Sequence, residues 1–401
     1  MQTNNRIYGL DSLRAIAMLL GIVLHAIIAY KVYPNEGWPS DDQLHAYGFD
    51  ALYLFIHSFR MQLFFLVAGF FARMLYLKIG ERAFFKHRYK RIVVPFIASM
   101  IFILPLSIAP FVYFQHCIAA GVPPAERSQV FWQHFLRWNG MAHLWFLYYL
   151  ILYYVVMLVV YRFKMSGGAK TFTNTLTRNY GSPLHVIVYI LILAAIQIAL
   201  FRTAEVEVST SIFPKPGHFT YYGFFFLLGV VLHRQSGRLF ELARYTWLYL
   251  AAGLALTVVA FKLLVLGHEN VAALSGLALI GVKLVVAAQT VFLTYGFIGF
   301  FLKYMNVQNG TIKYISDASF WLYLVHLSIV GAMQIVFLDT SVPGWLRPLG
   351  VLTVTTLIAM GTYQWFVRYS FIGTALHGPR DRAVKKRECR VDSLQSSNLC
   401  K

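Results

Sequence analysis

Two ionisable side chains within one apolar stretch are the first sign of chemistry in this sequence. The stretch from Tyr8 to Tyr30 carries Arg14 and His25, and it is longer than the ~20 helical residues that cross a bilayer. His25 follows Arg14 by eleven residues, and a helical rotation of about 1100° puts both on one face. Because ionisable groups in a span rarely face lipid, the pair predicts a polar cavity. The alternatives are an Arg14 that reaches the interface or pairs with Asp11, and a His25 bonded to a neighbouring helix.

The composition indicates a membrane protein with several spans. Hydrophobic residues make up 58% of the chain and charged residues 13%, whereas soluble domains carry about 25% charged residues. The first span is too long and too polar for the core of a signal peptide, so we expect it to be retained. The formal net charge is +19, but the bases lie in alternate loops, which sets orientation and argues against a nucleic-acid partner. The spacing of the three cysteines predicts neither a disulfide framework nor a metal site.

Ten apolar segments predict an all-α, polytopic membrane helix bundle. We place the spans at 8–30, 51–75, 91–114, 141–161, 184–202, 219–233, 245–266, 271–302, 313–336 and 345–368. Basic residues gather in the connections after the second, fourth, sixth and eighth spans and in the C-terminal tail, which predicts that both termini are cytoplasmic. Residues 1–370 form the predicted membrane domain, and 371–401 form a basic tail predicted to be disordered.

Polar groups recur at a similar depth on four of these spans. In the predicted orientation His25 and His57 lie in the outer half of the membrane, and Arg60 lies one turn deeper than His57. His143 opens the fourth span at the outer surface. The ninth span carries a stripe at helical spacing, formed by Ser319, Tyr323 and His326. Several such groups at matching depth on different spans predict a cavity in the central to outer layer of the membrane.

A second group of bases lies at the predicted cytoplasmic end of the third span. Arg88 and Arg91 share a helix face there, and guanidinium groups one turn apart can bind phosphate through paired hydrogen bonds. Together with Arg14 they predict an inward-facing anion site, although bases at this position also serve as ordinary topology anchors. Lys283, near mid-depth in the eighth span, is either a further site residue or a structural lysine paired with a carbonyl.

These residues fall into a recognisable order along the chain. Arg14 and His25 form an R-x10-H pattern in the first span, and Arg88 and Arg91 form R-x-x-R before the third. Further matching segments are FFLVAGFF (64–71), HLWFL (143–147) and SFWLYLVH (319–326). Over about its first 370 residues the chain resembles the acyltransferase-3 family of integral membrane acyltransferases. Ala68 departs from the pattern, because the family often has Ser there, and we assign that position no role.

The resemblance implies an O-acyltransferase that takes its acyl group from cytoplasmic acyl-CoA and gives it to a sugar hydroxyl outside. His25, together with Arg14, would be catalytic, with the imidazole acting as general base or carrying the acyl group transiently. Arg14, Arg88 and Arg91 would bind the donor phosphates or orient the thioester. The groups that would line the pocket, stabilise the oxyanion or hold an acyl carboxylate are His57, Arg60, His143, Ser319, Tyr323 and His326.

The resemblance also implies a location, partners and an acyl group. The protein would be a multi-pass protein of a bacterial inner membrane, with the lipid bilayer, acyl-CoA and a glycan acceptor as partners. It implies no metal and no permanently bound cofactor, with succinyl-CoA or acetyl-CoA as co-substrate. The segment FIHSFRMQLFF (55–65) resembles the glucan-biosynthesis branch, associated with succinylating osmoregulated periplasmic glucans, and Arg60 would pair with the succinyl carboxylate. The alternatives are an acetyltransferase of another envelope glycan, a transporter of anionic conjugates and a structural membrane component.

Overall fold

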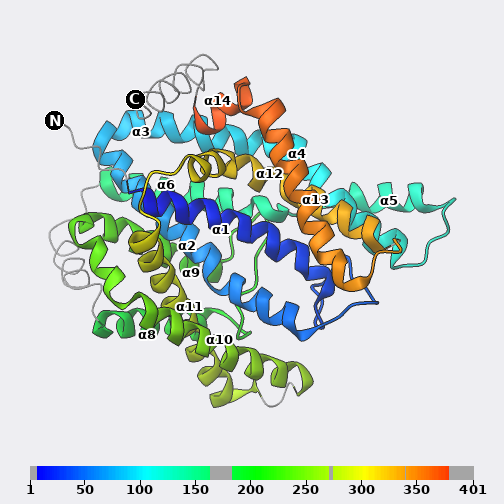
Figure 1. The fold of residues 1–401 in the computed structure, drawn as a ribbon, viewed down its shortest axis with the longest axis horizontal. Coiled ribbons are helices and arrows are strands. Elements are labelled where there is room, and N and C mark those ends of the chain that lie inside the picture. Colours follow the sequence, from blue (N-terminus) through cyan, green and yellow to red (C-terminus); the bar gives the residue numbers. More distant parts are fainter. Residues whose placement is uncertain (1–6, 163–182, 271–273, 339, 379–401) are drawn as a thin grey trace, which may run out of the picture.

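The protein is a bundle of helices arranged around α1 (Tyr8–Ile27). A computed structural model describes residues 7–162, 183–270, 274–338 and 340–378, and these contain helices and no β-strand. The helix α1 crosses the middle of the molecule (Figure 1) and packs against α2, α11, α12 and α13. The sequence therefore predicted the fold class correctly, and the span that carries Arg14 and His25 lies at the centre of the bundle.

The helices follow one another with short turns of tighter or wider helix between them. In chain order after α1 the elements are η1 (Ile28–Tyr30), α2 (Tyr47–Ile79), α3 (Glu81–Arg88), η2 (Tyr89–Val93), α4 (Val94–Tyr113), η3 (Phe114–Ile118), α5 (Arg127–Phe135), η4 (Ala142–Leu144), α6 (Trp145–Arg162), α8 (Pro183–Leu200), α9 (Pro216–Arg234), η5 (Ser236–Tyr245), α10 (Thr246–Glu269), α11 (Gly276–Tyr304), α12 (Gly310–Leu338), η7 (Gly344–Leu346), α13 (Arg347–Thr362), η8 (Tyr363–Val367) and α14 (Phe371–His377).

Eight helical segments of the described residues are long and apolar enough to cross a membrane. They are α1 with η1, α2, α3 through η3, η4 with α6, η5 with α10, α11, α12, and η7 with α13 and η8. The other two predicted spans correspond to α8, whose apolar part is shorter, and α9, which carries polar residues such as His218 along its length. The helix α8 packs on α11, and α9 packs on α2. The cytoplasmic placement of the termini stays a prediction.

Two hydrophobic cores meet at α1. Leu10, Leu13 and Ala17 of its first half belong to a large core built with α2, α6, α8, α9 and α11. Ile22 and Ala26 of its second half belong to a smaller core built with α4, α12 and α13. The helix α1 therefore joins the two cores.

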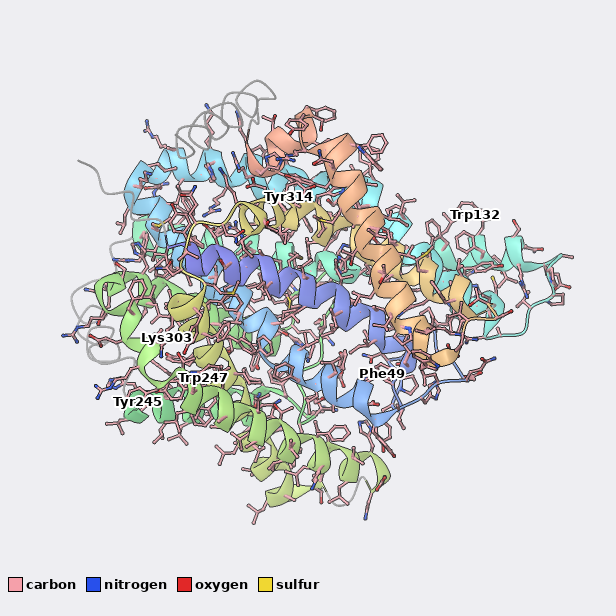
Figure 2. All side chains as sticks on the ribbon, viewed as in Figure 1. Phe49, Trp132, Tyr245, Trp247, Lys303 and Tyr314 are labelled. Carbon is pink, nitrogen blue, oxygen red and sulfur yellow. The ribbon has the colours of Figure 1, made fainter. Side chains whose placement is uncertain are left out.

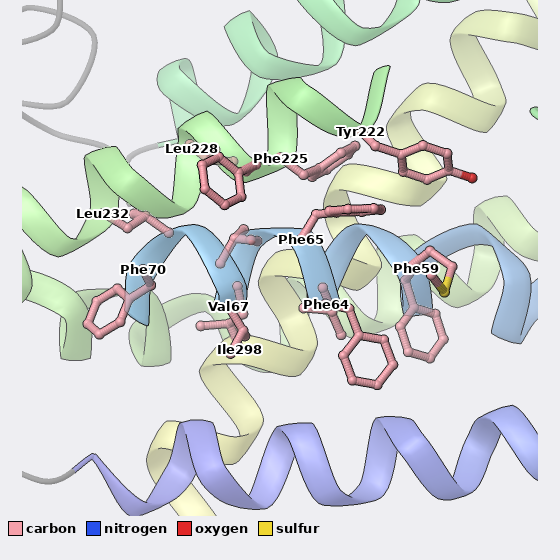
Figure 3. Close-up of a cluster of buried hydrophobic side chains, with 14 of the residues drawn as sticks. Phe59, Phe64, Phe65, Val67, Phe70, Tyr222, Phe225, Leu228, Leu232 and Ile298 are labelled. Atoms are coloured by element: carbon pink, nitrogen blue, oxygen red, sulfur yellow. The ribbon is translucent and has the colours of Figure 1, made fainter. Parts of the chain in front are cut away.

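The closest helix contact in the large core joins α2 to α9. The backbones at Gly69 and Gly229 approach so tightly that a Cβ on Gly69 would overlap the Phe226 carbonyl, and one on Gly229 would overlap the Leu66 carbonyl. Figure 3 shows the phenylalanines of α2 between α9 and α1. Inside a bilayer such packing replaces the hydrophobic effect as the force that holds helices together. The glycine of the FFLVAGFF segment therefore has a structural reason, which is close contact with α9.

The C-terminal region departs in part from the prediction. Residues 371–377 of the expected disordered tail form α14, where the Ser370 hydroxyl accepts a hydrogen bond from the Gly373 N–H at the first turn. The helix packs against η2 and α12, so the apolar residues Ile372 and Leu376 have a surface to cover. The rest of the predicted tail, from residue 379, lies outside the described residues.

Candidate active site

Three histidines from distant parts of the chain meet beside α1. The ring centroid of His25 lies 5.1 Å from that of His326 on α12, and His326 lies 5.5 Å from His143 in η4. Tyr323, one turn before His326, contacts the His143 ring at 5.3 Å. The sequence predicted these residues to lie at matching depth, and the structure brings them into one cluster.

Hydrogen bonds to backbone carbonyls fix the tautomers of two of these rings. His143 Nε2 lies 3.0 Å from the Leu324 carbonyl, and His326 Nδ1 lies 2.8 Å from the Tyr323 carbonyl. A carbonyl only accepts, so each of these nitrogens carries a hydrogen, and in the neutral ring the other nitrogen holds a lone pair. The Nδ1 of His25 is buried without a hydrogen-bond partner in the described part of the chain. Of the three imidazoles, His25 is therefore the one held least by hydrogen bonds of its ring.

His143 is buried at the start of the predicted fourth span, and its depth in the membrane stays a prediction. The residue before it, Ala142, has a φ of +42°, a left-handed conformation that non-glycine residues rarely adopt. The Met141 N–H donates to the Thr210 carbonyl at 2.8 Å, which holds this turn from outside. The hydroxyl of Tyr323 donates to the His143 carbonyl at 2.6 Å, which holds it from inside. The Tyr323 hydroxyl hydrogen is thus held by a backbone carbonyl, which fixes this turn, and the predicted oxyanion role of Tyr323 stays a prediction.

Arg14 lies on the same side of α1 as His25, as the spacing predicts. Its guanidinium donates to the Ser316 hydroxyl at 2.7 Å, while His25 contacts His326, so both side chains face α12. Asp11 lies 3.4 Å from the Arg14 guanidinium, and the arginine remains 39% exposed. The predicted neutralising pair is therefore present, and it leaves part of Arg14 accessible. Ser319 is the first residue of the stripe on α12. Its side chain is buried, and its hydroxyl donates to the Ser316 carbonyl within the same helix.

Arg60 reaches from α2 to α1 between the levels of Arg14 and His25. Its Nη1 would lie 2.5 Å from a Cβ on Gly21, so only glycine lets the guanidinium take this place. Its Nη2 contacts the Met61 sulfur at 3.5 Å, and its Nε is buried without a hydrogen-bond partner. Among the described residues no carboxylate pairs with this guanidinium. A cation in a helix bundle without an acidic partner is costly unless a ligand supplies the anion.

His57, one turn above Arg60, belongs to a different stack. Its ring lies 5.3 Å from that of Tyr53 and nearly parallel to it, and the Lys31 ammonium lies 4.1 Å from the Tyr53 centroid. Burial lowers the pKa of Lys31, while the negative charges of Glu205 and Asp50 raise it. The Nε2 of His57 is buried without a hydrogen-bond partner in the described residues.

Arg88 and Arg91 make structural contacts that the sequence did not indicate. The guanidinium of Arg88 lies 5.3 Å from the Phe84 ring and 4.9 Å from the Tyr154 ring. Arg91 donates to the Leu376 carbonyl at 3.5 Å, at the end of α14. Arg88 ends α3, whereas Arg91 lies within the wider helical turn η2, so the angle between the two side chains differs from that in a regular α-helix. The prediction that they share one face assumed a regular helix.

Lys283 lies apart from the histidines. Its ammonium donates to the Phe201 carbonyl at 2.6 Å, between α8 and α11. This bond is the structural pairing with a carbonyl that the sequence left open for Lys283 as the alternative to a role in the site.

The loop between η1 and α2 lies against the histidine cluster, where Trp38 stacks on His25, and the sequence did not indicate this contact. Arg347 donates two hydrogen bonds to the Asp41 carboxylate, at 2.8 and 3.0 Å, and both side chains are buried. Asp50 accepts from the N–H groups of Val32 and Tyr33 at 2.8 and 3.1 Å. The sequence showed these acids only as loop charges, and a bidentate partner 306 residues away leaves no local pattern.

The family comparison identifies the class of protein that carries this site. The family model described as the acyltransferase domain, acyltransferase-3, matches residues 7–364. The chain belongs to the acyltransferase-3 family. With its apolar helices, this membership makes the protein an integral, multi-pass membrane acyltransferase, as the sequence predicted.

Proteins of similar sequence share part of the length of this acyltransferase. Over 160 residues it is 34% identical to the glucans biosynthesis protein C of Escherichia coli strain SMS-3-5 and 33% identical to that of strain K12. The matched segment covers 40% of this chain and 39% of each of those relatives. No solved structure matches the chain.

The paired arginines Arg88 and Arg91 give a prediction about donor binding. If Arg88 and Arg91 hold the donor phosphates, Arg88→Lys and Arg91→Lys should each weaken acyl-CoA binding about tenfold, because lysine lacks the paired donors of a guanidinium. Calorimetry in detergent measures the affinity. Arg162→Lys, at the exposed end of α6, is the matched control. Wild-type affinity in both test variants would leave these residues as topology anchors only.

The buried pair of Arg347 and Asp41 gives a prediction about stability. Arg347→Met should lower the free energy of unfolding by about 3–5 kcal/mol, because it leaves the Asp41 charge buried without its partner. Thermal unfolding followed by tryptophan fluorescence measures the change. Arg238→Met should change little, since the Arg238–Glu241 pair is more than half exposed, with side-chain exposures of 53% and 57%. Equal melting temperatures for wild type and Arg347→Met would contradict the anchoring role.

Proposed function

We propose that this acyltransferase moves an acyl group, by preference succinyl, from cytoplasmic acyl-CoA to a hydroxyl of an extracytoplasmic glycan. An osmoregulated periplasmic glucan is the proposed acceptor, and a bacterial inner membrane is the proposed location. The name of the Escherichia coli relatives supports a glucan as the acceptor class. The observation that carries the proposal is Arg60, a guanidinium within the bundle that lacks a carboxylate partner among the described residues and lies between the levels of Arg14 and His25.

His25 would perform the proton transfer. In direct transfer the imidazole takes the proton of the acceptor hydroxyl, whose oxygen attacks the thioester carbonyl. The carbon–sulfur bond then breaks, and the CoA thiolate leaves and takes up a proton. In the two-step route a His25 nitrogen attacks first and passes the acyl group to the hydroxyl. Both routes end in a sugar ester and CoA thiol, and both need a His25 ring nitrogen with a free lone pair, for which Nδ1, buried without a partner in the described residues, is the candidate.

The donor would enter beside Arg14. A cavity of about 230 Å³ lies between the starts of α1 and α12, lined among others by Asp11, Ser12, Asn309 and Lys313. It adjoins the Asp11–Arg14 pair, and 39% of the Arg14 side chain is exposed. A guanidinium at this place can orient a thioester or a phosphate entering from the cytoplasm.

Arg60 would bind the carboxylate at the far end of a succinyl group. An acetyl group carries no charge and needs no such partner. A succinyl carboxylate left unpaired in a site of low dielectric would be expensive, and a guanidinium without an acid of its own removes that cost. Its place next to Gly21, one turn from His25 along α1, puts the charge within an acyl chain's reach of the reacting centre.

The test uses purified protein in detergent with a glucan acceptor and either succinyl-CoA or acetyl-CoA. Release of free CoA thiol reports donor turnover, and mass spectrometry of the glucan reports the transferred group. We expect faster thiol release with succinyl-CoA and succinyl esters on the glucan. A preference for acetyl-CoA would defeat the succinyl assignment. Passage of an anionic conjugate across proteoliposomes without thiol release would favour a transporter.

A further inference from the structure

Trp38, in the outer loop between η1 and α2, closes one face of His25. The two rings are nearly parallel, with an angle of 4° between them and 5.3 Å between their centroids. The imidazole of His25 also contacts that of His326, with 5.1 Å between the ring centroids and a tilt of 36°. Phe111 of α4 supports the indole by an edge contact at 4.7 Å. In this state no sugar ring has room against the face of His25 that the indole covers.

A second aromatic ring covers the neighbouring imidazole in the same way. Tyr53 stacks on His57 with an angle of 10° between the rings. Trp38 and Tyr53 both pack against one small cluster formed by Leu24, Ile28 and Ile56. Each of the two aromatic rings thus stacks on one imidazole, and both share one apolar support. We call Trp38 and Tyr53 the outer aromatic pair.

The chemistry of this wall suits a sugar. Aromatic rings bury a large apolar face and keep a polar handle, which matches a pyranose with its C–H face and its rim of hydroxyls. The indole N–H of Trp38 donates no hydrogen bond within the described residues, and the side chain is only partly buried. Asn35 lies beside the pair, where its side-chain oxygen accepts from Lys31 at 2.7 Å, so amide and ammonium groups stand at the rim.

The loop that carries Trp38 is fixed at both ends. Asp41 is held by Arg347, and Asp50 holds the N–H groups of Val32 and Tyr33. Between these anchors the backbone N–H of Trp38 donates to the Asn35 carbonyl at 3.1 Å in a local turn. A rotation of the indole side chain therefore uncovers His25 without unfolding the loop.

We propose that the outer aromatic pair is the acceptor subsite, in which a sugar ring exchanges the indole–imidazole stack for an indole–sugar stack and presents its hydroxyl to His25. The inference rests on the proposed function. It adds the place where the acceptor binds and the effect of the empty subsite on His25. While the site is empty, the indole keeps water away from His25. The competing reaction is hydrolysis, in which water attacks the thioester carbonyl, the carbon–sulfur bond breaks, and free acid and CoA thiol form.

The experiment compares hydrolysis with transfer in the purified full-length protein. Succinyl-CoA is supplied with or without a glucose heptasaccharide, and thiol release and heptasaccharide ester are both measured. Trp38→Ala should raise hydrolysis without acceptor about fivefold and the acceptor KM about tenfold, with the donor KM unchanged. Trp38→Phe keeps a ring over His25, so its hydrolysis should stay near wild type while its acceptor KM rises less. Calorimetry with the heptasaccharide alone should show the same loss of affinity in Trp38→Ala.

The control is Trp132→Ala, a change of the same residue type on α5, which projects from the bundle (Figure 2) and leaves the side chain 53% exposed. It should match wild type in every measurement. Transfer and hydrolysis that fall in the same proportion in Trp38→Ala, with unchanged heptasaccharide affinity, would overturn the subsite and leave Trp38 a packing residue. A wild type that turns over donor but never modifies the heptasaccharide would refute the glucan acceptor, while the hydrolysis comparison would still decide the shielding role.

Discussion

His25→Ala should lower acyl transfer at least ~10²-fold and leave the protein folded, because loss of a general base or nucleophile removes a factor of about 10²–10⁴. The Nδ1 of His25 is buried without a hydrogen-bond partner in the described residues, so little stability depends on it. Its backbone carbonyl accepts from Gln334 at 2.9 Å, and that bond survives the substitution. The measurements are the thiol-release rate in detergent and the melting temperature of the same sample.

The matched control for this change is another aromatic-stacked histidine on the same chain. His116 lies 3.8 Å from His134, ring to ring, in the hairpin formed by η3 and α5. His116→Ala should therefore keep near-normal turnover. A purified His25→Ala protein that turns over like wild type would show that the base or acyl carrier is a different group. A lowered melting temperature together with lost activity would point to a structural role for His25.

The periodicity of α1 allowed half of the site to be predicted. An α-helix advances by a fixed angle per residue, so the distance of eleven residues between Arg14 and His25 put both on one face before any partner was known. The structure adds the partner, which is α12 with Ser316 and His326. Depth along a span follows from the same arithmetic, which is why His326 was expected near His25.

The parts without a regular period could not be predicted. The inward turn of His143 depends on the left-handed Ala142, and nothing in the sequence MAHLW marks a non-glycine residue for that conformation. Trp38 lies in a loop, where no repeat indicates which ring will stack on which. The wider turn η2 begins directly after Arg88 and includes Arg91, and it packs against α14 and α6, contacts that the local sequence does not indicate.

The second prediction with a large effect concerns which acyl donor the protein prefers. Arg60→Met should lower turnover with succinyl-CoA about 10- to 100-fold, because a hydrogen bond to a charged group contributes about 1.5–3 kcal/mol. Turnover with acetyl-CoA should change less than about threefold, since an acetyl group has no charge to hold. The reason lies in the surroundings of Arg60, where the described residues offer a sulfur contact and no carboxylate. The measurement is thiol release with each donor in the same preparation.

Gly21→Ala tests the same role without changing the arginine. A Cβ at position 21 would lie 2.5 Å from Arg60 Nη1, so the guanidinium must move away from α1 while its charge is retained. If the position of the charge selects succinyl-CoA, Gly21→Ala should lose succinyl turnover more than acetyl turnover, in the same direction as Arg60→Met. Ala51→Gly, on α2 above the site, adds no atom near Arg60 and is the control for a small change in a span. Equal losses with both donors in both test variants would make Arg60 a structural residue, and the preference for a charged acyl group would then need another cation.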